Sequence, residues 1–364
     1  MRSELYIGLM SGTSIDGIDA VLVDFSGKPC RTLSHAHVAF AASLRAELNA
    51  LQQRGADELH RASLAANDLM DACTAAASAV LTAAGISARE LTAIGLHGQT
   101  VRHRPDLGYT IQLANPARLV EAIGATVVAD FRSRDVAAGG QGAPLAPAFH
   151  AALFGKADRH RAVVNIGGIA NVTDLPSDGA VRGFDIGPGN TLLDAWCERN
   201  TGAAYDRDGA WGAGGKVVEP LLQTLSEEPY FALKPPKSTG RDRFNMAWLR
   251  RQIKSSYAAA DVQRTLVALT ARTIAEAISS YCTGATEVLI CGGGAHNKTL
   301  MLELESGLSP RRVETTAAEG APVDQIEALA FAWLARETLA ARPGNIAAVT
   351  GARGARVLGA IYPA

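Results

Sequence analysis

The most informative stretch of this chain is Gly8-Leu-Met-Ser-Gly-Thr-Ser-Ile-Asp-Gly-Ile-Asp19. Apolar runs overlap it at both ends, from Leu5 to Met10 and from Ile18 to Val23, and this pattern predicts a β-hairpin. Small residues let a backbone approach an anion closely, and the free amides of a tight turn bind phosphate oxygens. The stretch therefore predicts a phosphate-binding hairpin, with a purely structural turn as the alternative.

Side chains of this hairpin add hydroxyl donors at Ser11, Thr13 and Ser14. Asp16 and Asp19 are candidates for holding Mg²⁺, directly or through water. No Gly-Lys-Ser/Thr follows the stretch, which excludes a P-loop, and the glycine spacing does not match a dinucleotide-binding fingerprint.

A similar pattern returns near residue 168. Arg161 to Ile166 and Ile169 to Val172 are apolar runs on either side of Gly167-Gly168. Alone this is an ordinary hairpin, but as the partner of the first one it predicts a second phosphate clamp. The echo predicts an α/β fold with two similar halves that face one cleft, with coincidence as the alternative.

The Gly- and Pro-rich run from Gly139 to Pro147 is the best candidate for a domain boundary. It predicts an N-terminal domain of residues 1–138 and a C-terminal domain of residues 139–364. A length of 364 residues suits two or three domains at roughly 100–200 residues each.

A third motif runs from Gly183 to Asn190, and Asn190 is predicted to cap the helix that follows. Asp185 would lie at a strand end pointing into the cleft. A carboxylate beside a phosphate site is electrostatically unfavourable unless it binds a metal or accepts a proton, so Asp185 is predicted to be a general base. Local capping of a turn is the alternative.

A fourth motif runs from Val288 to Asn297, as a strand, three glycines and a helical pattern. This layout predicts a nucleotide cradle in which backbone packs against a flat base or ribose. The alternative is a loop that is rich in glycine only for turning. Just before it, the apolar periodicity predicts a helix from Asp261 to Tyr281 with Asp261 as its N-cap.

Weaker candidates are polar residues near strand or helix ends. His97 could line a substrate pocket or be structural, and Arg132, Arg134 and Asp135 could bind an anionic substrate or form surface ion pairs. Glu327 opens a helix, where a glutamate is favourable in any case. Two longer segments are predicted as well: a helical stripe over residues 44–84 that includes Leu59 and Leu64, and a polar loop over residues 229–244 whose lysines could reach phosphate.

Composition narrows the classes of function. The 35 basic and 36 acidic residues give a net charge of -1, so a basic footprint for nucleic acid is absent. Five cysteines without a C-x-x-C pair argue against a disulfide framework or a cysteine-type zinc site. No apolar stretch suits a signal peptide or a membrane span. We expect a soluble, cytoplasmic protein with neither a nucleic-acid nor a membrane partner.

Taken together, the motifs resemble the anhydro-N-acetylmuramic acid kinases of peptidoglycan recycling, within the actin-like and hexokinase-like ATPase superfamily. The resemblance covers nearly the whole chain, from Tyr6 to the C-terminal Val357-Leu-Gly-Ala-Ile-Tyr, and Ile15 stands where Leu or Met is expected. It rests on Gly8–Asp19, His97-Gly-Gln-Thr, Asn165-Ile-Gly-Gly-Ile-Ala-Asn, Phe184-Asp-Ile-Gly-Pro-Gly-Asn, Pro236-Lys-Ser-Thr-Gly-Arg and Cys291-Gly-Gly-Gly.

The resemblance implies two actin-like, ribonuclease H-like domains that close on ATP and a sugar. The implied reaction converts 1,6-anhydro-N-acetylmuramic acid, ATP and water to N-acetylmuramic acid 6-phosphate and ADP. Asp185 would activate water for attack on C1, and the released O6 would attack the γ-phosphoryl group. A homodimer is implied as well.

Site roles follow from the same resemblance. Asp19, with Asp16, would orient Mg²⁺, and His97, Arg134 and Glu327 would contact the sugar, with Arg134 pairing its lactyl carboxylate. The expected ATP-binding residues are Gly12, Thr13, Ser14, Asp16, Gly17, Asp19, Gly167, Gly168, Gly187, Gly189, Asn190, Gly292, Gly293, Gly294 and Asn297.

Two alternatives stay open at this point. One is a kinase that phosphorylates a free hydroxyl of an ordinary amino sugar. The other is a regulatory ATPase that uses the nucleotide as a conformational switch, which the absence of a further substrate-binding domain after the triple glycine disfavours.

Overall fold

The computed structural model describes residues 4–12, 14–179, 181–240 and 242–364. Strands and helices alternate along the chain, which confirms the α/β class. The chain forms two units. Unit 1 comprises Met1–Phe149 and Gln325–Ala364, and unit 2 comprises His150–Asp324.

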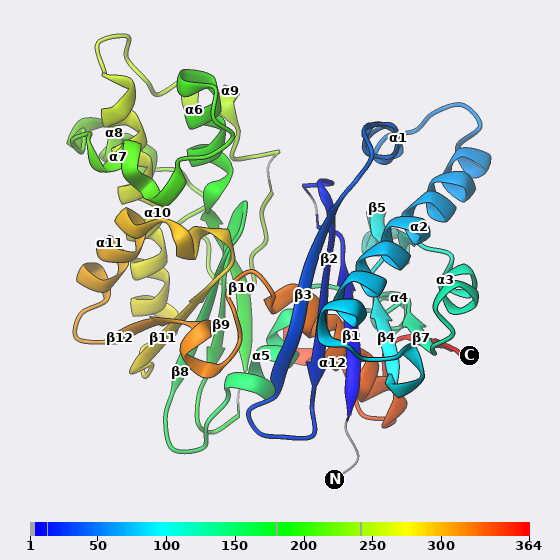
Figure 1. The fold of residues 1–364 in the computed structure, drawn as a ribbon. Coiled ribbons are helices and arrows are strands. Elements are labelled where there is room, and N and C mark those ends of the chain that lie inside the picture. The colour runs from blue at the N-terminus through cyan, green and yellow to red at the C-terminus, as the bar shows by residue number, and fades with distance from the viewer. Residues whose placement is uncertain (1–3, 13, 180, 241) are drawn as a thin grey trace. The chain divides into compact units, whose positions relative to one another are not determined.

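This division differs from the single boundary expected at residue 139. The Gly- and Pro-rich run begins inside unit 1, where the amide of Gly142 donates to the buried Asp135 carboxylate at 2.7 Å. The first boundary instead falls inside α5, Ala146–Phe154. The chain returns to unit 1 after residue 324 because α12, Ile326–Leu339, packs on the unit 1 sheet, whose edge β13 extends (Figure 1).

Unit 1 is built on a six-stranded sheet in the order β13-β7-β4-β1-β2-β3, and a separate hairpin, β5–β6. Strands β1, β2 and β3 are antiparallel neighbours, whereas β4 and β7 run parallel to β1. The strands are β1 Leu5–Met10, β2 Gly17–Asp24, β3 Arg31–Ala39, β4 Ala93–Leu96, β5 Gln99–Arg104, β6 Tyr109–Leu113, β7 Val127–Ala129 and β13 Ala360–Tyr362.

Unit 2 repeats the same strand order. Its sheet runs β10-β9-β8-β11-β12, with three antiparallel strands followed by two parallel ones. The strands are β8 Arg161–Ile166, β9 Ile169–Leu175, β10 Arg182–Pro188, β11 Glu287–Cys291 and β12 Arg312–Thr315. Both predicted hairpins and the two similar halves are therefore confirmed, in the strand order of the ribonuclease H-like fold.

Helices cover these sheets (Figure 1). In unit 1 they are α1 Ala42–Ala50, α2 Glu58–Ala84, α3 Pro116–Ile123, α4 Ser133–Ala137, α12 and α13 Ala347–Thr350, with short 3₁₀ turns η1 Ala88–Glu90 and η2 Pro105–Leu107. In unit 2 they are α6 Asn190–Thr201, α7 Ala210–Ala213, α8 Glu219–Ser226, α9 Met246–Arg250, α10 Ala259–Tyr281 and α11 Lys298–Leu308, with 3₁₀ turns η3 Arg207–Gly209, η4 Gly293–His296 and η5 Thr316–Glu319.

Two details of the predicted helices are wrong. Helix α10 begins two residues early, and Asp261 instead accepts the Lys216 amide at 2.7 Å. Leu59 and Leu64 are exposed, at 88% and 52%, because the buried side of α2 starts only at Ala65. Among the described residues, no helix combines the length and apolar character needed to cross a membrane.

Two glycines seat α12 on the unit 1 sheet. Gly8 of β1 and Gly95 of β4 are register partners. A Cβ at Gly8 would overlap the Ala328 carbonyl, and one at Gly95 would overlap the Phe331 carbonyl. Ile7 and Leu9 point to the opposite face, into the core that α2 covers. The two glycines therefore set how closely α12 and its Glu327 approach the sheet.

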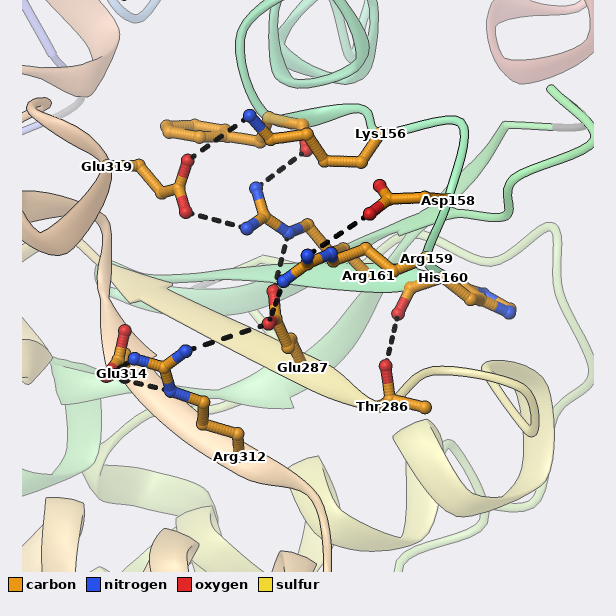
Figure 2. A network of polar contacts seen from close by, with 11 residues as sticks. Lys156, Asp158, Arg159, His160, Arg161, Thr286, Glu287, Arg312, Glu314 and Glu319 are labelled. Atoms are coloured by element: carbon orange, nitrogen blue, oxygen red, sulfur yellow. Dashed lines mark hydrogen bonds and ion pairs between the residues drawn. The ribbon is translucent and has the colours of Figure 1, made fainter.

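An ion network fastens the strands of unit 2 at their N-terminal ends (Figure 2). Arg161, only 4% exposed, donates to Glu287 at 2.7 Å and to Glu319 at 2.6 Å. Burial opposes ionisation of Glu287, yet Arg161 and Arg159 hold the pKa of that carboxyl below its usual range. The hydrogen bond from Arg161 also holds the pKa of Glu319 below its usual range, although burial opposes this effect. The network joins β8, β11 and η5.

Candidate functional site

The turn between β1 and β2 is held by the segment that follows β4. The Ser11 hydroxyl donates to the side-chain carbonyl of Gln99, whose amide donates to the Gly12 carbonyl at 3.4 Å. His97 Nδ1 bonds to the Ser11 carbonyl at 3.2 Å. Thr13, predicted to hold phosphate, lies outside the described residues. The start of the turn is thus held in place by His97 and Gln99, as a preorganised anion site requires.

Ile15 anchors the far end of the turn. Its side chain is 4% exposed and belongs to the unit 1 core, while its backbone is left-handed, with φ at 51°. A β-branched residue rarely adopts this conformation, so the core contact is made at the cost of backbone strain. Gly17 follows as the first residue of β2, where a Cβ would clash with the Val38 carbonyl.

The two predicted magnesium ligands differ in their surroundings. Asp16 accepts the Ser14 hydroxyl at 2.6 Å and is exposed. Asp19 lies on β2, where one carboxylate oxygen is 2.9 Å from His37 Nδ1 and 3.7 Å from His35 Nε2. Burial opposes ionisation of Asp19, but the hydrogen bonds from His35 and His37 keep its pKa lowered. Within the described residues, no three acidic, histidine or cysteine side chains form a metal-binding group.

His97 is occupied inside unit 1. Arg132 donates to its Nε2 at 3.2 and 3.1 Å. Because an arginine can only donate, Nε2 accepts and the proton sits on Nδ1. Burial and the charge of Arg132 lower the pKa of His97 to about 3. Both ring nitrogens of His97 are thus engaged within the protein, by the Ser11 carbonyl and by Arg132.

Arg132 is a partly buried cation of this region. Burial lowers its pKa to about 10, and the charge of Glu327 works in the opposite direction. Arg132 therefore bonds His97 directly, and the charge of Glu327 acts on Arg132. Arg134, the residue predicted to pair the lactyl carboxylate, instead donates to the Val357 carbonyl at 3.1 Å near the surface. Its neighbour Asp135 is fully buried.

Asp185, the predicted base, lies in the middle of β10 of unit 2 at a β-bulge, and not at a strand end as predicted. The register with β9 shifts between Asp185 and Gly187, and bulges of this kind re-aim side chains. The carboxylate accepts the Ser238 hydroxyl at 2.9 Å and the Thr239 amide at 3.1 Å. Burial raises the pKa of Asp185, and these two bonds oppose that effect. A partly buried carboxylate with a raised pKa suits a general base.

The Gly-Gly turn of unit 2 binds protein rather than presenting a bare loop. The Gly167 carbonyl accepts the Asn190 amide at 2.8 Å, and the Gly168 carbonyl accepts the amides of Gly189 and Thr191 at 2.9 and 3.1 Å. These amides lie at the start of α6, so they are not free for phosphate. The predicted cap also differs, because the N-cap is Gly189 and the Asn190 side chain donates to the Ile166 carbonyl at 3.1 Å.

Glycines of the third and fourth motifs make close contacts inside unit 2. A Cβ at Gly187 would meet the Phe231 ring at 2.6 Å. One at Gly292, which has φ of 79°, would clash with Asn165, and one at Gly294 would clash with Ile166. Of the three consecutive glycines, Gly293 lines a pocket.

That pocket is a cavity of about 570 Å³ in unit 2, within the roughly 300–1,000 Å³ typical of small-molecule sites. The predicted residues Asn190, Gly293 and Asn297 line it. Asn297 also caps α11 by accepting the Leu300 amide at 3.0 Å. Sequence reasoning missed the other residues that line this pocket, which are Leu193, Asp194, Tyr205, Asp206, Arg207, Asp208 and His296.

These missed residues come from α6, the η3 region and η4, which are far apart in the sequence. Asp206 also stabilises the backbone beside the pocket, because its carboxylate accepts hydrogen bonds from the amides of Trp211 and Gly212, both at 2.9 Å. The acidic character of the wall suits donors such as ribose hydroxyls or a purine amino group better than phosphate. The sequence of η3 contains a glycine and an acidic residue, but no motif that would have predicted a binding site there.

Comparison with known proteins assigns the family. The family model described as anhydro-N-acetylmuramic acid kinase matches residues 4–364. A protein named anhydro-N-acetylmuramic acid kinase from Nitrosomonas europaea is 53% identical over 361 residues, covering 99% of each chain. One of the same name from Bordetella pertussis is 55% identical over 365 residues, covering 99% of this chain and 96% of its own.

Solved structures are more distant. A glucokinase of the ROK family from Streptomyces griseus is 15% identical with a TM-score of 0.42, covering 92% of this chain and 99% of its own. Component A of a dehydratase from Acidaminococcus fermentans is 13% identical with a TM-score of 0.47, covering 90% of this chain and 96% of its own. The likeness to the sequence relatives extends over nearly the full length of both chains, and the chain belongs to the anhydro-N-acetylmuramic acid kinase family.

Proposed function

We propose that this protein converts 1,6-anhydro-N-acetylmuramic acid, ATP and water to N-acetylmuramic acid 6-phosphate and ADP. The observation that carries the proposal is the Asp185 carboxylate, partly buried and held by two hydrogen bonds, in a chain of this family. The anhydro sugar has no free 6-hydroxyl, because O6 is bonded to C1. A kinase that acts on it must open that bond.

Asp185 is proposed to take a proton from water as the water oxygen bonds to C1. The C1–O6 bond breaks with its electron pair going to O6, which then attacks the γ-phosphoryl group of ATP and releases ADP. The raised pKa of Asp185 matches this role, since a stronger base accepts the proton more readily near neutral pH.

ATP is proposed to place its nucleoside in the unit 2 pocket, where carboxylates such as Asp206 and Asp208 accept hydrogen bonds. Phosphate contacts are proposed for the turn from Gly12 to Ser14 and for the amides of Gly167 and Gly168. A Cβ at Gly167 would come no closer than 3.7 Å to any neighbour, so this turn is accessible.

Mg²⁺ is proposed to be held by Asp19, with Asp16 nearby. The donor chemistry fits, because both are carboxylates, and one oxygen of Asp19 has no hydrogen-bond partner among the described residues. Bound Mg²⁺ would neutralise phosphate charge. For the sugar, we propose contacts from Arg132 and Glu327, with Arg134 a further candidate and His97 as the residue that orients Arg132.

A cytoplasmic location is proposed because ATP is the co-substrate, and a homodimer because the family resemblance implies it. Light scattering of the purified protein tests the second point: a mass near twice 38.0 kDa supports the dimer, and a mass near 38.0 kDa contradicts it.

Incubation with the anhydro sugar, ATP and Mg²⁺ in ¹⁸O-labelled water tests the reaction by mass spectrometry. A product with one phosphoryl group and one labelled oxygen at C1 is expected. ADP formed only with another amino sugar would transfer the activity to ordinary hydroxyl phosphorylation. ADP formed equally well without any sugar would indicate a nucleotide-dependent switch instead.

A further inference from the structure

A strap of residues 230–240 runs along the outer edge of β10, which is the edge strand of its sheet. The Asp185 amide donates to the Lys237 carbonyl at 3.1 Å, as a neighbouring strand would bond it. The Tyr230 hydroxyl donates to the Asp185 carbonyl at 2.8 Å. Both backbone groups of Asp185 are thus bonded to the strap.

The strap is anchored in the core of unit 2. Tyr230 is 1% exposed, and its ring packs edge-on against the ring of Phe244, which is fully buried. Phe231 stacks on Phe244 and fills the space above Gly187. The Lys237 ammonium bonds to the carbonyls of Tyr230 and Phe231 at 3.3 and 3.2 Å, which closes the strap on itself. A rigid base therefore carries the residues that follow.

The next two residues of the strap bind the same oxygen of Asp185. The Ser238 hydroxyl and the Thr239 amide both donate to Oδ2. In the part of the chain that the structure describes, Oδ1 accepts no hydrogen bond. The two carboxylate oxygens are therefore inequivalent: one is bonded to the protein, and the other is free.

We propose that Ser238 is a positioning residue for Asp185: with the Thr239 amide it fixes Oδ2, so that Oδ1 is the oxygen that takes the proton from water. The inference rests on the proposed function and adds a role for the strap. The anhydro ring-opening step needs a proton acceptor in one orientation, and a carboxylate held through one oxygen can turn less freely than an unbonded one.

Among the described residues, the charged and titratable groups near Asp185 do not bond its carboxylate. The Tyr230 hydroxyl bonds the Asp185 carbonyl, Lys237 is engaged by carbonyls, and Arg243 lies 5.4 Å from the Tyr230 ring centroid. From α10, Glu276 lines a small pocket with Lys237, and from β9 the register partner of Asp185 is the neutral Asn171. The Ser238 hydroxyl is thus a side-chain donor that can be removed without deleting a charge.

The test measures kcat, KM for ATP and the pH dependence of kcat/KM for wild type, Ser238→Ala, Ser238→Thr and Ser226→Ala. Wild type must first give the labelled product, and its failure would contradict the proposed function rather than the role of Ser238. Ser226→Ala is the matched control, because among the described residues this hydroxyl bonds the Leu222 carbonyl within α8 and nothing else.

Ser238→Ala is expected to lower kcat at least about tenfold, the usual range for a hydrogen bond to a charged group. It should also move the acidic limb of the profile to higher pH, because the carboxylate loses a donor that favours its charged form. Ser238→Thr should restore both, with KM for ATP unchanged throughout. A wild-type profile in Ser238→Ala would overturn the proposal. A loss of kcat without a shift of the acidic limb of the pH profile would also overturn it. So would a loss of kcat accompanied by equal losses of ADP affinity and Tm.

Discussion

The two units share one strand order but close their first hairpins differently. In unit 1, six residues connect β1 to β2, and their ends are fixed by Gln99, His97 and the buried Ile15. In unit 2, only Gly167 and Gly168 connect β8 to β9, and their carbonyls accept the first amides of α6. One topology thus supports a loop rich in hydroxyls in one unit and a short turn that organises a helix in the other.

The two units also differ in the surroundings of Asp19 and Asp185, the carboxylates to which roles are proposed. Asp19 of unit 1 is 39% exposed and is kept ionised by two histidines. Asp185 of unit 2 is partly buried, has no cationic partner among the described residues and carries a pKa raised by burial. The comparison teaches that unit 1 is suited to holding fixed negative charge near a cation, whereas unit 2 is suited to accepting a proton.

The largest expected effect breaks this comparison at Asp185. Asp185→Asn keeps the shape and the Ser238 bond but cannot accept a proton. We expect turnover to fall by about 10²–10⁴-fold, with ADP affinity unchanged because the pocket lies on other residues. Steady-state kinetics and calorimetry check both. Turnover within threefold of wild type would exclude Asp185 as the base.

The next effect concerns the ion network of unit 2. Arg161→Met leaves the nearly buried Glu287 short of its main partner, and we expect a loss of about 3 kcal/mol at pH 7. The lowered pKa values of Glu287 and Glu319 contribute stability above their unfolded value near 4.5, and this is lost as pH falls. The difference between variant and wild type should therefore shrink below about pH 4.5.

Urea unfolding at pH 7 and pH 4 measures this difference, and hydrogen exchange locates it. Faster exchange in β8 and β11, without change in β1 and β4, is expected. An equal loss of stability at both pH values would show that packing, and not charge, accounts for the role of Arg161.

A third prediction compares glycines of the two units. Gly95→Ala places a methyl group into the backbone of α12, so we expect a loss of about 3 kcal/mol. Gly167→Ala has open space and should cost less than about 1 kcal/mol. Thermal unfolding of both variants checks the contrast. Equal Tm values for the two variants would contradict the close packing of α12 against Gly95.

A smaller effect is expected at Asp19. Asp19→Asn removes the charge that unit 1 offers to Mg²⁺, and we expect a higher Mg²⁺ requirement and turnover lowered about tenfold. A Mg²⁺ titration of turnover measures this, with the exposed Asp16→Asn as the comparison. Wild-type Mg²⁺ dependence in Asp19→Asn would move the metal role away from this strand.

The smallest effect sharpens the contrast between the two turns. Ile15→Leu keeps the volume in the core and removes the β-branch from a left-handed backbone. We expect a gain of about 0.5 kcal/mol, seen as a slightly higher Tm. A lower Tm would mean that the shape of Ile15, more than its backbone strain, sets stability there.

Short-range patterns predicted much of this molecule. Both hairpins, the strand before Gly292 and the repeat of one half by the other follow from apolar runs broken by small residues. The base role of Asp185 was predicted because a carboxylate beside an expected phosphate site must bind a metal or accept a proton, and it stays a prediction. The family resemblance added what the residues alone left open, namely the sugar and the water.

Other features depend on contacts that no local pattern contains. Gly8 and Gly95 indicate a seat only once a helix more than two hundred residues later packs on them. The sequence suggested His97 as a sugar contact, and only the folded structure shows that Arg132 donates to its ring nitrogen. Ser238 lies in a polar loop that reads as solvated, and its role is visible only because the strap folds back onto β10.

The late return of the chain to unit 1 also affects how the protein is made. During synthesis, β1, β2 and β4 leave the ribosome long before α12, so the Gly8 face of their sheet stays uncovered until residues beyond 325 have emerged. Unit 2 is continuous in sequence and can finish first. A nascent chain halted near residue 324 would thus pair a completed second unit with a first unit that still exposes an apolar surface, which is the kind of surface that chaperones bind.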